Sequence, residues 1–134
     1  MGAMGAGPFD SDGALDWVAD YADDGVIMVR NAFQEALESD EFLDADLGEA
    51  AVAAAAVVAR ARGWNGLDYW PEGVDAHSDA IRTQNDLTEL AIRVLKRVLC
   101  PETSEIAELW SDEGGEDEAE FVRVNTELTK ALAA

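Results

Sequence analysis

Basic residues, cysteine and histidine are scarce in this sequence. Its 134 residues include 9 Lys+Arg against 29 Asp+Glu, one cysteine and one histidine, so the formal net charge is −20. The acidic excess argues against nucleic acids and anionic membranes as partners, because both would repel the protein at long range. A single cysteine excludes an internal disulfide. One histidine and one cysteine are too few nitrogen and sulfur ligands for a protein-only zinc site.

Long apolar runs and targeting signals are also missing. The longest apolar run, 50–59, is about half as long as the roughly 20 residues that a membrane-spanning helix needs. The opening MGAMGAGPF has neither the basic segment nor the apolar core of a secretory signal. We therefore expect a cytoplasmic protein. The length is typical of one domain, so we expect residues 1–134 to form a single all-helical domain.

Helical periodicity runs through most of the chain. Apolar residues recur at three- and four-residue spacing, which places them on one face of a helix, and no run alternates as a strand would. Asp23 or Asp24 is predicted to cap the second helix. The clearest stripes contain Leu87, Leu90, Ala91, Val94, Leu95, Val98 and Leu99, then Val26, Val29, Phe33, Ala36 and Leu37, and finally Phe121, Val124, Leu128 and Leu132.

The charge distribution indicates which helices are central. Residues 49–66 hold one acid and two bases, and residues 84–100 hold two acids and three bases, whereas 101–134 hold ten acids and two bases. Charged side chains avoid buried helices, because desolvating an unpaired ion costs several kcal/mol. We therefore predict an all-α fold: a single compact domain of about five to seven helices around two central apolar helices, 49–62 and 84–100, with an ordered loop at 63–83.

No catalytic motif appears in the sequence. His77 and Cys100 lie in different predicted elements, so nothing favours a Cys–His dyad. The stretch 10–13 begins like a calcium-binding loop, but its glycine stands at the fourth position rather than the sixth. The acids of 112–118 match no such register either. We expect no cofactor, no metal and no catalytic residue, with helix faces and caps accounting for most of the acids.

Two features are candidates for binding a partner. The loop contains Trp64, Tyr69 and Trp70, and tryptophans in a long loop serve either to anchor a partner or to pin the loop to the helices. The second feature is an acidic stretch between two predicted helices. Its carboxylates belong to Asp112, Glu113, Glu116, Asp117, Glu118 and Glu120.

The N-terminal residues resemble a known family. The string MGAMGAGPFDSDGALDW is similar to the start of the domain of unknown function 4259 family, small bacterial and mainly actinobacterial proteins that typically begin Met-Gly-x-Trp-Gly-x-Gly-Pro-Phe. Met4 and Phe121 depart from the family pattern, which usually has tryptophan there. The resemblance implies a helical fold and supplies no established activity. The matching positions are Gly2, Gly5, Gly7, Pro8, Phe9, Asp10, Asp12, Asp16 and Trp17.

Two classes of function fit these observations. The first is a non-catalytic interaction protein that binds a basic partner protein, for example an immunity-type or charge-mimic inhibitor, because negative potential steers basic proteins toward it. The alternative is a carboxylate-rich, metal-dependent hydrolase or other small enzyme, although the Glu-x-x-His pairs of helical metal sites are absent. The charge fits a merely solubilising surface equally well. It opposes close self-association except through an apolar patch.

Overall fold

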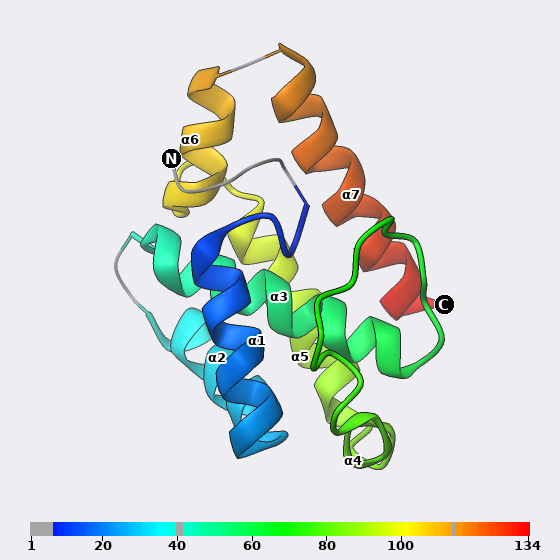
Figure 1. The fold of residues 1–134 in the computed structure, drawn as a ribbon. Helices are drawn as coiled ribbons and strands as arrows, with labels where there is room; N and C mark the ends of the chain where they lie inside the picture. The colour runs from blue at the N-terminus through cyan, green and yellow to red at the C-terminus, as the bar shows by residue number, and fades with distance from the viewer. Residues whose placement is uncertain (1–6, 40–41, 114) are drawn as a thin grey trace.

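The computed structural model describes residues 7–39, 42–113 and 115–134 (Figure 1). Within these ranges the chain forms helices and an isolated β-bridge between Leu43 and Ser104, with no strand, so the all-α prediction is confirmed. No described helix is both long enough and apolar enough to cross a membrane. The helices are α1 (Asp12–Asp24), α2 (Ile27–Glu38), α3 (Ala45–Ala61), α4 (Ser78–Arg82), α5 (Asp86–Val98), α6 (Glu105–Glu113) and α7 (Gly115–Ala133).

Helix α3 lies at the centre of the fold and contacts each of the other six described helices (Figure 1). It is apolar on all sides, and its alanines let the neighbours approach closely. Gly48 extends this close approach to α6, because a Cβ there would lie 3.0 Å from Cγ2 of Ile106. The buried residues of α3 are Gly48, Ala51, Val52, Ala53, Ala54, Ala55, Ala56, Val57, Val58, Ala59 and Ala61.

Helix α5 is the main neighbour of α3, as the charge distribution predicted. It buries one face and exposes Glu89, Arg93 and Lys96 on the other. Helix α7 packs on α5 through the apolar stripe predicted at the C-terminus. The apolar stripes of α5 and α7 therefore both contribute to the core. The buried residues of these two stripes are Leu87, Ala91, Val94, Leu95 and Val98 on α5, and Phe121, Val124, Leu128 and Leu132 on α7.

The boundary between α1 and α2 differs from the prediction. Asp23 and Asp24 do not cap the second helix; they form the last turn of α1. Gly25, with φ of 93°, ends α1 in a conformation that side chains disfavour, and its N–H donates to the Tyr21 carbonyl at 2.9 Å. Helix α2 then begins at Ile27 without a side-chain cap.

Two connections that are distant in sequence meet beside α3. The Leu43 N–H donates to the Thr103 carbonyl, and the Glu105 N–H donates to the Leu43 carbonyl, both at 2.8 Å. The Glu105 carboxylate also accepts a hydrogen bond from the Ala45 N–H at 2.7 Å. This bridge joins the α2–α3 connection to the α5–α6 connection, and Leu43 is completely buried beneath it.

The close packing around α3 predicts an asymmetry between two alanines. Ala55→Leu inserts three carbons into a site with no exposed surface, so we expect a loss of roughly 1–3 kcal/mol of unfolding free energy. Ala19→Leu, on the exposed face of α1, is the control and should change stability by less than about 0.5 kcal/mol. Urea denaturation measures both. Equal losses in the two variants would contradict the packing described for α3.

Candidate partner-binding site

The family motif begins with a tight turn. The Gly7 N–H donates to Oδ2 of Asp10 at 2.9 Å, and the Asp10 N–H donates to the Gly7 carbonyl at 3.2 Å. A Cβ on Gly7 would lie 2.7 Å from the same Oδ2, so a side chain at this position would push the Asp10 carboxylate out of its hydrogen bond. Phe9 points into the core and is only 2% exposed. Gly2 and Gly5 of the motif lie outside the described residues.

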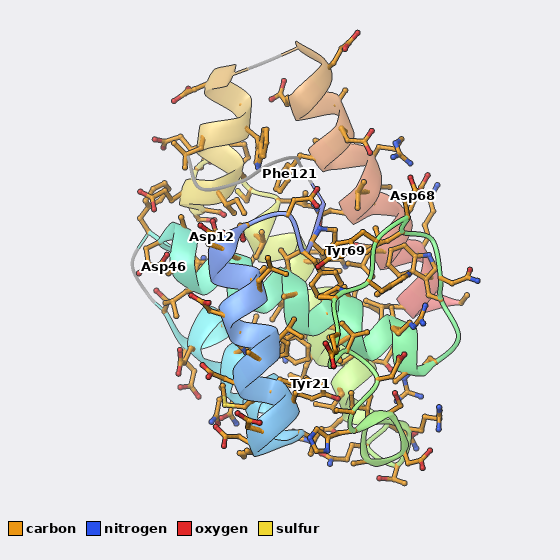
Figure 2. The ribbon with its side chains drawn as sticks, in the orientation of Figure 1. Asp12, Tyr21, Asp46, Asp68, Tyr69 and Phe121 are labelled. Atoms are coloured by element: carbon orange, nitrogen blue, oxygen red, sulfur yellow. The ribbon has the colours of Figure 1, made fainter. Side chains whose placement is uncertain are left out.

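The motif continues into the first turn of α1. The Ser11 hydroxyl accepts a hydrogen bond from the Ala14 N–H at 3.1 Å and so caps the helix. Glu49 of α3 approaches the same turn, and a Cβ on Gly13 would collide with its carboxylate. Burial raises the pKa of the Glu49 carboxyl. A hydrogen bond from Ser11 lowers this pKa, and the negative charges of Asp46 and Asp12 raise it further. Figure 2 shows Asp12 and Asp46 on the neighbouring elements.

Trp17, the last residue of the motif, packs inside the fold. Its ring stacks on Tyr21, with centroids 5.4 Å apart, and Tyr21 meets the edge of His77 at 5.2 Å. Burial raises the pKa of the Tyr21 hydroxyl to about 12, partly offset by the backbone of His77. The only histidine donates through Nε2 to the Ala22 carbonyl at 3.0 Å. It therefore ties the end of the loop to α1.

The two tryptophans of the loop pin it to the core. Trp64 and Trp70 form an edge-to-face pair with centroids 5.8 Å apart. Trp70 also packs against Phe9 at 5.7 Å, and the Arg60 guanidinium lies 4.6 Å from its ring centre. Tyr69, between them in sequence, is 54% exposed. The predicted aromatic set thus separates into two anchors and one exposed ring.

The predicted acidic stretch is divided between two helices. Asp112 is exposed near the end of α6, whereas Glu116, Glu118 and Glu120 belong to α7. Glu120 forms an ion pair with Arg123, which also binds Glu127 at 3.0 Å. The side chains of Glu113 and Asp117 lie outside the described set.

Three distant segments enclose a groove of about 330 Å³. It brings the family motif, the aromatic loop and α7 together, and Figure 2 shows Asp68 and Tyr69 on the loop between the other two. The sequence points to each of these three segments separately, but no motif in it marks Leu67, Asp68 or Arg123 as part of a site. The one signal present is the spacing of Glu120 and Glu127 at i−3 and i+4 from Arg123, which favours ion pairs on a helix. The groove is lined by Gly7, Pro8, Phe9, Asp10, Gly66, Leu67, Asp68, Tyr69, Glu120, Arg123 and Val124.

A second pocket, of about 500 Å³, surrounds α4. Its charged groups are already engaged with one another: Arg60 pairs with Asp75 at 3.1 Å, and Arg82 pairs with Asp79. Among the described residues no group of three or more His, Cys, Asp or Glu side chains is arranged to hold a metal ion. The groove beside Tyr69 also contains an ion pair, but its lining includes an exposed ring and an exposed carboxylate, Asp68, that no ion pair engages among the described residues, so it is the better candidate site.

Gly66 sets the position of the tryptophan pair. A Cβ at this residue would lie 2.7 Å from the Trp64 ring, so Gly66→Ala must displace a large, partly buried indole. We expect a loss of about 1–3 kcal/mol of unfolding free energy and a changed near-ultraviolet circular dichroism spectrum. Asn65→Ala, at the exposed neighbouring position, is the control and should leave both unchanged. An unaltered spectrum for Gly66→Ala would refute this account of the loop.

Glu49 makes the stability pH-dependent. Its raised pKa means that the folded state retains the proton to a higher pH than the unfolded chain does. The stabilisation that protonated Glu49 gives the folded state is fully present below the ordinary glutamate pKa of about 4.3. It is lost as the pH rises through the higher pKa that Glu49 has in the folded protein. Glu49→Gln should therefore flatten the decline of stability above about pH 4.3 and be more stable than the parent at pH 7.

Urea unfolding between pH 4 and pH 7 tests this, with the exposed Glu35→Gln as the control for net charge. An identical pH profile in the two variants would show that burial of Glu49 has no such effect.

Comparison with known proteins identifies the family. The family model described as Domain of unknown function (DUF4259) matches residues 2–122. The match covers the N-terminal motif, α1 to α6, the aromatic loop and the start of α7. Neither the curated proteins nor the solved structures include a significant match. Because the family model spans most of the chain, the resemblance of the N-terminal motif is confirmed, and the protein belongs to the domain of unknown function 4259 family.

Proposed function

We propose that this protein is a non-catalytic interaction protein whose acidic surface binds a basic partner protein. The observation that carries the proposal is the separation of its charges: six of the nine basic residues are engaged by contacts within the fold, whereas most of the acids are exposed at the surface. The net charge of −20 therefore reaches solvent with little internal compensation. Such a field raises the rate at which a basic protein associates.

The arginines are mostly used to hold the fold together. Arg97 donates to the Ala36 carbonyl at 2.8 Å and satisfies the end of α2. Arg82 donates to the Ala61 carbonyl at 2.7 Å at the end of α3. Both contacts fill the need of a helix C-terminus for a donor and a positive charge. Further carboxylate or carbonyl contacts engage Arg30, Arg60, Arg62 and Arg123.

Helix α1 presents the clearest unpaired acidic surface. Its exposed acids recur every three or four residues, so they share the face opposite the buried Trp17 and Tyr21. The helix contains no basic residue, and no ion pair to these acids occurs among the described residues. The face consists of Asp12, Asp16, Asp20, Asp23 and Asp24.

The end of this face opposes the stability of the helix. Asp23 and Asp24 stand in the last turn of α1, where the helix dipole disfavours negative charge. Helices α2 and α6 likewise lack a base in their last turn. Acids at positions that lower stability support a role in recognition. If they served solubility alone, the same acids could stand at helix N-termini, where the helix dipole favours negative charge.

The partner class follows from this charge. Specific forms of the proposal are an immunity-type protein that blocks a basic toxin, and a charge mimic that blocks a nucleic-acid-binding protein. We place the protein in the bacterial cytoplasm, where the free thiol of Cys100 fits a reducing environment.

Affinity capture tests the proposal directly. The immobilised protein is exposed to a lysate of the organism that encodes it at low and at high salt, and the retained proteins are identified. We expect basic proteins to be retained at low salt and released at high salt, because exposed charges are screened. Retention of no basic protein at low salt would sink the proposal.

Asp23 and Asp24 supply a matched test of position. The double variant Asp23→Asn/Asp24→Asn should raise the unfolding free energy by about 0.3–1 kcal/mol per residue at low ionic strength and weaken retention of the basic partner. Glu72→Gln/Glu102→Gln changes the net charge equally at exposed positions that lie outside every described helix. This control should bring no gain in stability and a smaller loss of retention. Equal retention in the two double variants would remove α1 from the binding surface.

A further inference from the structure

The geometry points to a specific subsite: we propose that the groove beside Tyr69 receives a lysine or arginine side chain of the basic partner. The inference rests on the proposed function, because it names the chemistry that one surface of the protein recognises. It depends on three properties of the groove, namely its size, its charge and its exposed aromatic ring.

The groove has the dimensions of a site for a long side chain. Its volume of about 330 Å³ lies at the lower end of the range for small-molecule sites. The apolar part of its lining consists of the half-buried Leu67 and of Pro8, Phe9 and Val124, which are themselves buried. The methylene stem of lysine or arginine packs well on such groups while its charged end stays near polar atoms.

The groove is negatively charged. Its lining includes the carboxylates of Asp10, Asp68 and Glu120 and one guanidinium, that of Arg123. Arg123 is held by ion pairs to Glu120 and Glu127, so its charge is neutralised within α7. Asp68 is exposed, and within the described chain no ion pair engages it. With Glu120 paired to Arg123, the carboxylates of Asp10 and Asp68 leave the groove with a net negative charge, which is complementary to a cation and repels an anion.

Tyr69 provides a second, independent indication. It is 54% exposed, although Trp64 and Trp70 on either side pack against the core. The anchoring tryptophans hold the intervening loop, so the exposed ring is presented on a fixed backbone. A guanidinium or ammonium group over such a ring is stabilised by its electron-rich face. Tyrosine is also among the residues enriched at binding hot spots.

Nuclear magnetic resonance with a defined probe tests the subsite. The probe is acetylated, amidated tri-arginine, and its matched control is the tri-citrulline peptide, which has the same shape without charge. We expect tri-arginine to shift backbone amides of residues 7–10, 66–69 and 120–124, and tri-citrulline to shift none of them. Shifts confined to α1, with the groove unaffected, would overturn the subsite while leaving the acidic-surface proposal standing. Absence of any binding, together with no captured basic protein, would remove both.

Variants separate the ring from the charge. Tyr69→Ala should weaken tri-arginine binding about two- to fivefold, and Tyr69→Phe should retain it, because the phenylalanine ring keeps the cation contact. Asp68→Asn should weaken binding more than Asp16→Asn, which changes the net charge equally on α1. Far-ultraviolet circular dichroism confirms that each variant is folded. Equal effects of the two aspartate variants would overturn the subsite. Concentration-dependent dimers that Tyr69→Ala abolishes, without peptide binding, would assign the groove to a second copy instead.

Discussion

The close approach of six helices to α3 is the constraint on which the rest of the structure depends. A helix surrounded on every side has room only for small apolar side chains, and α3 is correspondingly rich in alanine. Charges cannot enter this centre without a large loss of solvation. The acids of the chain are therefore displaced outward, and the arginines that remain close to the core are bound to helix ends. Packing and surface charge are two consequences of one arrangement.

Much of this arrangement could be predicted from local composition. The composition predicts that the alanine-rich stretch and the segment rich in Leu and Val are central, because neither shares the acidic excess of the rest of the chain. Burial and charge exclusion are linked, so the prediction had a physical basis. The junction at Gly25 could not be read in the same way. Aspartate favours the beginning of a helix, and Asp23 and Asp24 were therefore assigned to the wrong helix. Under the proposed function, binding of a basic partner would favour aspartates at a helix C-terminus, against the preference of aspartate for helix N-termini.

The candidate groove could be predicted only in its parts. The N-terminal motif and the loop aromatics were singled out by residue type, but their contact is a product of tertiary packing between segments more than 50 residues apart. No local pattern encodes that Phe9 lies against Trp70. Nor does sequence alone distinguish which aromatic of the loop stays outside. That depends on the path of the backbone past Gly66, where the Trp64 ring leaves no space for a side chain.

The bridge between Leu43 and Ser104 bears on how the chain folds. It closes a loop of about 60 residues, and the entropy lost in such a closure must be repaid by contacts formed at the same time. Neighbouring helices such as α1 and α2, or α6 and α7, meet at much shorter separation and are favoured early. The bridge is thus expected to form only once α3 and α5 have docked. The sequence separation of its two ends therefore places the bridge late in the order in which the contacts of this fold form.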